Sequence, residues 1–403
     1  MRFQWLRPWA ALIFCALPAW GQGRVLTLEE ALALAHDRGA GVALAKGRVA
    51  EARAHLVQAG RRFQENPTVE IHGGYRRTRD DFFDYEAVVS QSLYSGRRRS
   101  ARLAGAGASV QRAAAELAEV ERRLIRDVGI AFARTLKAQE RIALLTKSRQ
   151  AADALLSGIE RRYDAGENTA LEQNRARVVA AGARAELSAA EAQKESELAE
   201  LKVLLGLSEP VVVRGSLAPG PSVPLAAFLA GLDRRPDLQV LTAELGEAEA
   251  EVLLGLALSR PEMGVRGALA REERAEIVTA GVVVALPVHD RGQEALAVGE
   301  ARTAALRQAL TTARGAAAAE VRGAYSALSH RLKAVRELEQ TALPALEDNE
   351  SLAEKSFEAG EIGLGELLLI RREILETRLS YLDSLLEASL SRFALEAAAG
   401  APQ

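Results

Sequence analysis

Two stretches of the chain, RRYDAGENTALEQNRARVV at residues 161–179 and KSFEAGEIGLGELLLIRRE at residues 355–373, decide its fold. Each centres on a glycine between two long segments of helix-forming residues, and Gly360 follows Gly166 by 194 residues. The same separation recurs in the pairs Pro67 and Pro261, Gly73 and Gly267, and Glu172 and Glu366. A separation that stays constant over so long a stretch indicates an internal duplication, which is the mark of a repeat architecture.

The duplication predicts two repeats that share one order of elements. We expect repeat 1 at residues 24–209, a linker at 210–230 and repeat 2 at 231–400. In each repeat we expect a helical segment, then a β-hairpin at 68–94 or 262–287, then a long helical hairpin at 97–205 or 292–398. The linker is rich in proline and glycine, a composition that interrupts helices.

The helical hairpins are unusually long for a globular protein. The segment from Arg97 to Tyr163 contains no proline, and as one helix it would extend for about 100 Å. Its apolar stripe is narrow and rich in small residues, which is typical of coiled-coil-like packing. Pro344 of repeat 2 matches Gln150 of repeat 1 and predicts a kink or a break in the helix. An ordinary extended coiled coil is the alternative, but it leaves the hairpins unexplained.

The predicted β-hairpins alternate in polarity along the chain. The first strand places Val69, Ile71, Gly73 and Tyr75 on one face and Glu70, His72, Gly74 and Arg76 on the other. A shift of 194 residues gives the third strand the same alternation, and the connecting tips TRDDF and AREERAE are charged. This pattern favours pieces of a membrane β-barrel, with a soluble sheet on a helical bundle as the alternative.

One chain supplies too few strands to close a barrel. The sequence offers four, whereas small closed barrels need about eight. Open sheet edges leave backbone groups without hydrogen bonds, which lipid does not tolerate. Other chains must therefore complete the sheet, so we expect an obligate oligomer.

Composition excludes several other classes of protein. The 403 residues include 52 Lys and Arg against 54 Asp and Glu, without the basic excess of nucleic-acid binders. One cysteine rules out a disulfide framework. Five scattered histidines lack ligand spacing, and the sequence has no serine-hydrolase, zinc-protease or P-loop motif. We therefore expect no enzymatic activity, no cofactor and no resident metal.

Residues 1–21 have the pattern of a secretory signal peptide. Two arginines precede a short apolar run, and the small residues Ala19 and Gly21 have the spacing of a cleavage site. Cys15 raises the alternative of a lipid anchor, but the bulky Phe14 before it disfavours that modification. The longest later apolar run, residues 277–288, is shorter than the roughly 20 residues that a spanning helix needs.

Several motifs, taken in order, resemble the TolC-like outer-membrane efflux factors over nearly the whole mature chain. They are LTLEEALALA (26–35), ENP before the first strand, SQSLYSGRRR (90–99), YDAGENTALE (163–172), LLGLSEP (204–210), RRPDLQV (234–240), ALPVHDRG (285–292), ALPALEDN (342–349) and FEAGEIGLGELL (357–368). The short chain without a convincing lipoprotein cysteine is similar to the heavy-metal branch typified by CzcC.

The resemblance implies a fold that is mainly α with a β-barrel part. It implies a homotrimer whose twelve strands close one outer-membrane β-barrel, continued by a long α-helical barrel in the periplasm. Such a protein is the outer-membrane channel of a tripartite efflux system, a passive exit duct for small cargo such as metal ions or drugs. Its partners would be a periplasmic adaptor protein, an inner-membrane pump of the RND type and outer-membrane lipid.

Two other functions stay open from the sequence. One is the outer-membrane duct of a type I protein secretion system, which shares the same architecture. The other is a soluble periplasmic coiled-coil scaffold, which would use the helices alone.

The two glycine turns would lie farthest from the barrel. There the resemblance places the contact with the adaptor and the closed periplasmic mouth of the channel. The candidate contact residues are Tyr163, Asp164, Gly166, Glu167, Phe357, Glu358, Gly360 and Glu361. The two glycines would equally suit left-handed caps at helix ends, a purely structural role.

Glu172 and Glu366 begin the returning helices at matching positions and are candidate gate acids. In a trimer they would form a ring of carboxylates, which favours cations. The resemblance supports Glu366 more, although the second acid of relatives is replaced here by Leu369. For Glu172 the alternative is an acid that stabilises a helix N-terminus.

Arg97, Arg98 and Arg99 directly follow the second strand. They would either lie at the lipid headgroups or form a solvated start of the long helix. His72 is the one histidine on the predicted lumen face of the sheet.

Overall fold

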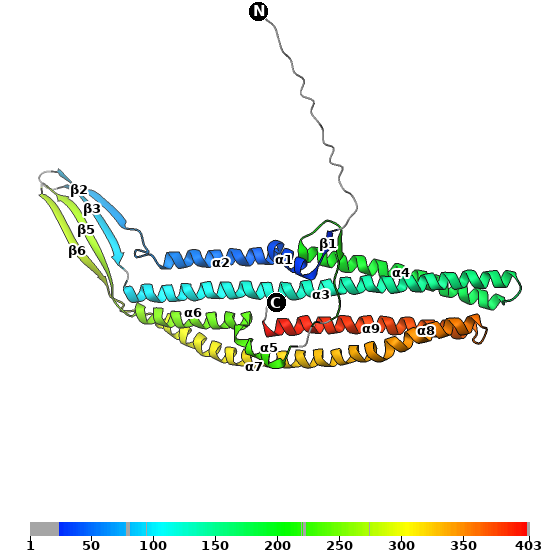
Figure 1. Cartoon of the computed structure of the whole chain (residues 1–403). Helices are drawn as coiled ribbons and strands as arrows, with labels where there is room; N and C mark the ends of the chain where they lie inside the picture. Colours follow the sequence, from blue (N-terminus) through cyan, green and yellow to red (C-terminus); the bar gives the residue numbers. More distant parts are fainter. Residues whose placement is uncertain are drawn as a thin grey trace, which may run out of the picture.

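The computed structural model describes residues 24–77, 81–93, 95–218, 220, 223–273 and 275–400. The protein is long and gently curved, with a β-sheet at one end and the turns of two helical hairpins at the other (Figure 1). The predicted signal peptide, residues 1–21, lies outside the described residues, as do residues 78–80 of the first hairpin tip.

The helices account for most of the chain. They are α1 (Leu28–Arg38), α2 (Ala40–Ala59), α3 (Gly96–Asp164), α4 (Ala170–Leu205), α5 (Leu225–Ala230), α6 (Pro236–Leu258), α7 (Gln293–Glu337), α8 (Leu343–Glu358) and α9 (Leu364–Ala399). The strands are β1 (Arg24–Leu26), β2 (Thr68–Arg77), β3 (Asp81–Leu93), β4 (Val211–Val213), β5 (Glu262–Glu272) and β6 (Ala275–Ala285).

Helix α3 is the axis of the molecule. Its 69 residues run without a break from a cap at Ser95, whose hydroxyl accepts a hydrogen bond from the backbone N–H of Arg98. The absence of proline allows this length, and the predicted long helix is confirmed.

The corresponding helix of the second half is interrupted, as Pro344 predicts. Helix α7 ends at Glu337, and a five-residue π turn, Leu338–Ala342, separates it from α8. Pro344 is the second residue of α8 and has no N–H to donate to the turn before it. The wider π turn takes up the misfit between the two helices.

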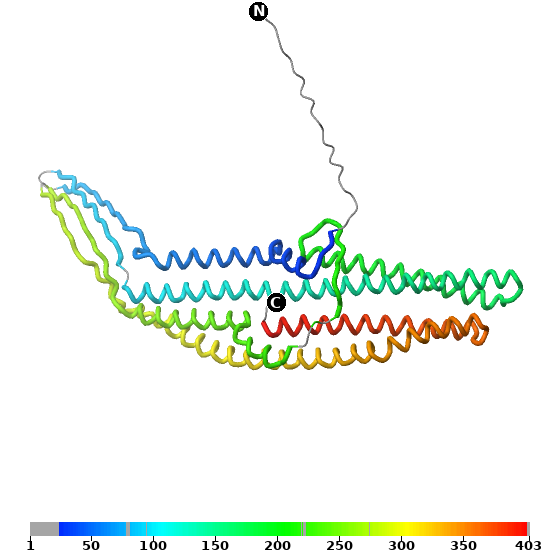
Figure 2. The backbone as a smooth tube through the Cα atoms, viewed as in Figure 1, coloured from blue at the N-terminus to red at the C-terminus, as the bar shows by residue number. Residues whose placement is uncertain are grey.

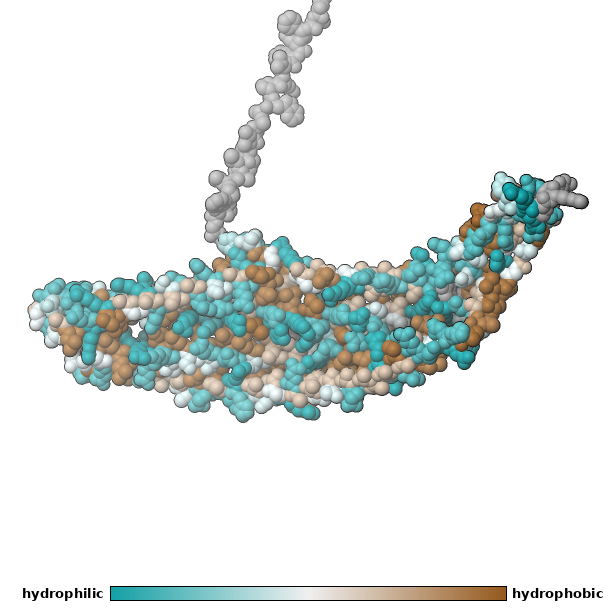
Figure 3. Space-filling view, turned by 180° about the vertical axis from the view of Figure 1, so that it is seen from behind, coloured by the Kyte–Doolittle hydropathy of each residue, from teal (hydrophilic) through white to brown (hydrophobic). Residues whose placement is uncertain are grey.

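The four long strands form one antiparallel sheet in the order β2-β3-β5-β6. Val69 pairs with Val89, which pairs in turn with Gly267. This register gathers one apolar face from all four strands, which includes Val69, Ile71, Tyr75, Phe83, Tyr85, Ala87, Val89, Met263, Val265, Leu269, Val278, Val282 and Val284. Hydrophobic surface follows the sheet in Figure 3. The alternation predicted for the hairpins is therefore observed.

The opposite face of the sheet carries its ion pairs. Arg76 contacts Asp84 at 2.8 Å, and Arg266 lies 3.8 Å from Glu86 on the neighbouring strand. His72 lies 3.7 Å from Glu70 on the same face. Cross-strand pairs of opposite charge help to hold this register.

The helices form a curved layer that continues the order of the strands. Helices α2 and α4 lie along one side of α3, and α6 and α9 lie along its other side. Helices α7 and α8 pack beyond α6 and α9. Because β2, β3, β5 and β6 are consecutive in the chain with α2, α3, α6 and α7 and are joined to them by short segments, the sheet and the helical layer have the same order of neighbours.

Some short elements were not expected from the sequence. Strand β1 pairs in parallel with β4, and β4 and α5 both lie within the segment expected to be a linker. Strands β1 and β4 with α1 cover one face of α3 around a core that includes Leu26, Val128, Phe132, Leu136, Leu205 and Val211, whereas α5 packs against α7 and α9. Three-residue strands are too short to give a readable alternation.

The R-P-D-L motif of residues 235–238 ties the second half together. The side chain of Arg235, which is only 7% exposed, contacts Asp237 at 2.9 Å and Glu320 at 2.6 Å. It also donates a hydrogen bond of 2.8 Å to the carbonyl oxygen of Ala398 at the end of α9. A buried guanidinium is stable only with such partners, so this motif joins α6, α7 and α9.

The contact between α6 and α7 depends on a glycine. A Cβ atom at Gly255 would lie 2.6 Å from the backbone nitrogen of Leu296, which cannot move without shifting α7. We expect Gly255→Ala to destabilise the protein by about 1–3 kcal/mol through overpacking, measured as a lower melting temperature. Gly107→Ala is the matched control, since a Cβ there meets nothing within 4 Å. It should stabilise α3 by about 0.4–1 kcal/mol; equal melting temperatures for the two variants would contradict this account.

Candidate functional site

The two glycine turns lie together at the end of the molecule away from the sheet (Figure 2). Ile159 of α3, Ala176 of α4 and Leu364 of α9 are buried against one another there. Phe357 of α8 packs on this cluster, and the Arg162 guanidinium lies 5.9 Å from the centre of its ring. The two hairpins therefore end in one packed tip rather than in two independent turns.

Both turns have the same backbone geometry. Gly166 and Gly360 have φ values of 81° and 77°, a left-handed conformation that favours glycine. The N–H of Glu167 donates to the carbonyl of Arg162 at 2.8 Å, and the N–H of Glu361 donates to that of Ser356 at 2.8 Å. The structural role expected for the two glycines is thus present.

The predicted adaptor-contact residues gather on the surface of this tip. Of the set given above, Phe357 is half-buried, and Tyr163, Asp164, Gly166, Glu167, Glu358, Gly360 and Glu361 are exposed. Around the two glycine turns the tip therefore presents these acids and one tyrosine, next to the exposed cations Arg161, Arg162 and Lys355.

Glu172 is held in a capping box at the start of α4. Its carboxylate accepts hydrogen bonds from the backbone N–H of Thr169 at 2.8 Å and from the Thr169 hydroxyl at 2.9 Å. These bonds, with a smaller contribution from Asn168, hold the pKa of Glu172 below its ordinary value. The arrangement agrees with the structural alternative for Glu172, because its charge stabilises the helix N-terminus.

Glu366 is placed differently, although the sequence offset pairs it with Glu172. The residue before α9 is Gly363, which has no side chain to form a capping box. Glu366 is exposed, and Leu369 one turn later is 65% exposed. Of the two candidate gate acids, only Glu366 projects from its helix without a cap.

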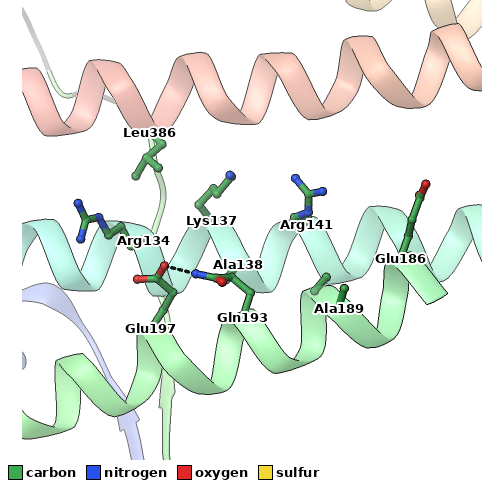
Figure 4. A pocket seen from close by; sticks show the side chains of 10 residues that line it. Arg134, Lys137, Ala138, Arg141, Glu186, Ala189, Gln193, Glu197 and Leu386 are labelled. Carbon is green, nitrogen blue, oxygen red and sulfur yellow. Dashed lines mark hydrogen bonds between the residues drawn. The ribbon is translucent and has the colours of Figure 1, made fainter. Parts of the chain in front are cut away.

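A groove that the sequence did not suggest lies between α3, α4 and α9 (Figure 4). It has a volume of about 430 Å³, and α3 lines it with Arg134, Lys137 and Arg141. Lys137 pairs with Asp383 of α9 at 2.6 Å, and Arg134 lies 4.0 Å from Glu200 of α4. The spacing of three and four residues between these cations is the sequence signal that places them on one helix face.

The groove opens on the face of α3 opposite the short strands. On the other face Phe132 and Leu136 lie beside Gly215, and Gln139 donates a hydrogen bond to the carbonyl of Val213. Residues 134, 137 and 141 lie about half a turn away from that side on a helix with 3.6 residues per turn. The layer thus has one face covered by the short elements and one open face with charged side chains.

The described residues offer no preformed metal centre. No group of three or more His, Cys, Asp or Glu side chains among them is arranged to hold a metal ion. None of the described helices is apolar enough over a sufficient length to cross a membrane.

Comparisons with known proteins agree with this architecture. Residues 28–207 match the family described as outer membrane efflux protein. The cobalt-zinc-cadmium resistance protein CzcC of Cupriavidus metallidurans is 29% identical over 364 residues, which cover 89% of this chain and 86% of that protein.

Solved structures show the same fold at low sequence identity. That of CusC has a TM-score of 0.80 at 16% identity and covers 93% of this chain and 92% of its own. That of the Campylobacter jejuni CmeC outer membrane channel has a TM-score of 0.77 at 14% identity, with coverages of 93% and 85%. The predicted fold class, mainly α with a β part of the TolC-like kind, is confirmed.

The capping box makes the start of α4 sensitive to pH. Because folding lowers the pKa of Glu172, its stabilising effect is complete above the ordinary value of 4.5 and is lost as the pH falls through the folded pKa. We expect the amides of the first turn of α4 to exchange faster in Glu172→Ala than in wild type at pH 7. Below pH 4.5 the difference should shrink, as hydrogen-exchange mass spectrometry would show.

Glu366→Ala is the control for this measurement, because Gly363 leaves no capping box to break. Its effect on the first turn of α9 should be much smaller. A pH-independent difference at α4, or equal effects of the two substitutions, would contradict the assigned role of Glu172.

Proposed function

Since residues 28–207 match the outer membrane efflux protein family and CzcC is similar over most of the chain, we propose that this protein is the outer-membrane channel of a tripartite efflux system. It would act as a passive exit duct for small cargo and would carry out no chemistry. The observation that carries the proposal is the four-stranded sheet, which has a continuous apolar face and two open edges, β2 and β6.

The open edges support a homotrimer. In the described part of the chain, β2 and β6 each pair on one side only, and lipid does not tolerate such unpaired edges. If β6 of one copy paired with β2 of the next, three copies would close a barrel of twelve strands. The apolar face would then contact lipid, and the face with Arg76, Asp84, Arg266 and Glu86 would line the lumen.

The two borders of the helical layer also need partners. Its two borders, α2 with α4 and α7 with α8, expose large apolar side chains to solvent in a single chain; they include Leu44, Leu171, Val178, Val203, Val298 and Leu352. Exposed apolar side chains that recur along an element favour contact with a partner. Closure of the sheet by three copies would bring these borders together and form a helical tunnel.

The other face of the layer is covered by β1, β4 and α1, which would obstruct a passage. The open face would therefore line this tunnel. Helix α9 exposes acids at spacings of three, four or seven residues, namely Glu366, Glu373, Glu376, Asp383 and Glu387. Ion pairs with Arg372, Lys137 and Arg331 engage Glu376, Asp383 and Glu387, so Glu366 and Glu373 are the acids of this row without an ion pair in the described residues. Ser389, which points the other way, donates a hydrogen bond to the carbonyl of Leu217 in the segment after β4. An acidic row in a water-filled passage favours cations.

We propose divalent metal cations as the cargo. The named relative is a cobalt-zinc-cadmium resistance protein, and the acids of α9 suit positively charged cargo. These observations favour efflux of small ions over a type I protein secretion duct. The apolar sheet, which needs lipid, disfavours a soluble scaffold.

The remaining partners follow from the orientation of the molecule. With the sheet in the outer membrane, the packed tip would lie in the periplasm, about 100 Å away along α3. A periplasmic adaptor protein would contact the exposed tip residues, and an inner-membrane pump of the RND type would supply the cargo and the energy.

Conductance of the purified protein in planar bilayers tests the duct and its mouth. We expect cation-selective channels whose selectivity falls in Glu366→Gln, because this acid is exposed at the tip. Glu172→Gln, the matched control, should leave selectivity near wild type, because Glu172 serves the capping box. A strain that lacks the gene should be sensitive to cobalt, zinc or cadmium. Absence of conductance would refute the duct, and equal effects of the two substitutions would remove Glu366 from the mouth.

A further inference from the structure

The four junctions between strands and helices lie at one level of the molecule. The guanidinium of Arg99 donates a hydrogen bond of 2.7 Å to the carbonyl of Gly60, which joins the end of α2 to the start of α3. Arg98 forms an ion pair with Glu262 at the start of β5. Gly255 near the end of α6 packs against Gly292 at the start of α7. These contacts hold the four junctions together at one level. We call this level the ring segment, because three copies of the chain would complete a ring.

The cluster Arg97–Arg99 is only partly a solvated helix start, because Arg98 is half-buried while Arg97 and Arg99 are exposed. Arg98 and Arg99 serve the contacts between the junctions, while Arg97 is exposed. The other junctions add exposed arginines of the same kind. The junction arginines, defined as the exposed ones whose side chains make neither an ion pair nor a hydrogen bond in the described part of the chain, are Arg61, Arg62, Arg97, Arg260 and Arg291.

The acids at this level do not balance these charges. They are Glu65, Glu262, Asp290 and Glu294, against seven arginines at positions 61, 62, 97, 98, 99, 260 and 291. Glu262 pairs with Arg98, and the Asp290 carboxylate keeps its charge while it accepts a hydrogen bond of 2.9 Å from the backbone N–H of Gly292. Glu65 also has a partner. Only Glu294 at this level remains exposed without a contact in the described residues. The ring segment is therefore positively charged.

Apolar side chains surround the junction arginines on the side of the sheet. Leu286, at the end of the apolar sheet face, is 67% exposed, and Val288, Met263 and Phe63 are also exposed. The far end of the sheet differs, because Glu272 and Glu273 lie near Arg76 there. The arginines thus occur where the apolar surface of the sheet ends and the helices begin. At that level a membrane changes from hydrocarbon to headgroup.

We propose that the junction arginines bind the phosphate groups of anionic phospholipids in the leaflet next to the helices. This rests on the proposed membrane position of the sheet. A guanidinium donates two parallel hydrogen bonds to phosphate oxygens, and basic residues beside a membrane attract anionic lipids. The arginines would fix the depth of the barrel and keep the helical tunnel upright on the membrane.

The test uses the full-length protein in nanodiscs of equal parts phosphatidylglycerol and phosphatidylcholine, with lipid retention measured by native mass spectrometry. We expect wild type to retain phosphatidylglycerol preferentially. The variant with all five junction arginines changed to Gln should lose about tenfold or more of that preference. High salt should weaken it in wild type.

A matched variant controls for the loss of positive charge. It changes to Gln five exposed arginines of the helical part, for which the described residues provide no ion pair: Arg48, Arg53, Arg234, Arg322 and Arg336. This variant should keep the wild-type preference. Equal retention of both lipids by wild type, or equal loss in the two variants, would overturn the inference while leaving the channel intact. A protein that fails to enter nanodiscs at all would instead refute the proposed membrane function.

Discussion

The unpaired backbone of two strand edges is the constraint on which the rest of the structure depends. A sheet of four strands with a continuous apolar face suits lipid, yet its borders β2 and β6 each leave a row of N–H and C=O groups without partners. In water such edges can bind solvent, but in hydrocarbon each unmet group costs several kcal/mol. A single chain therefore cannot be the functional unit if the sheet lies in a membrane.

The order of the helices in the layer follows the order of the strands in this sheet. Because a short segment joins each long strand to a helix, the neighbours β2, β3, β5 and β6 make neighbours of α2, α3, α6 and α7. Arg98 and Arg99 reinforce this continuity through their contacts with Glu262 and Gly60. Closure of the sheet would then close the helical layer, so that one assembly step would form both the barrel and the tunnel. The π turn before Pro344 adapts the second half to the same curved layer.

Much of this organisation could be predicted from the sequence. The absence of proline from Arg97 to Tyr163, the break at Pro344 and the alternation of the strands each have a direct local cause. The end of α2 is harder to read from the sequence: the helix stops at Ala59, although Pro67 alone would allow it to run further. Gly60 and the contacts that Arg99 and Arg102 make with the turn end the helix earlier.

Features that depend on long-range contacts could not be read from the sequence. Strand β1 exists because β4, almost two hundred residues later, pairs with it, and the cations of the groove matter because α4 and α9 face them. The two candidate gate acids differ for a reason that the sequence does contain. The offset of the repeats made them equivalent, but Thr169 precedes one helix and Gly363 precedes the other. That difference was present in the sequence, and it decides that Glu172 caps its helix while Glu366 stays exposed.

Cysteine cross-linking between the two edges of the sheet tests the central account most directly. The one cysteine of the sequence, Cys15, lies within the predicted signal peptide, so Ile71→Cys on β2 and Val282→Cys on β6 would supply the only thiols of the mature chain. With a short bifunctional thiol reagent, membranes of the double variant should yield a covalent trimer on a denaturing gel. Either single variant should yield only the monomer, because each β2 meets a β6. A double variant that stays monomeric, or single variants that cross-link equally well, would contradict closure of the sheet by three copies.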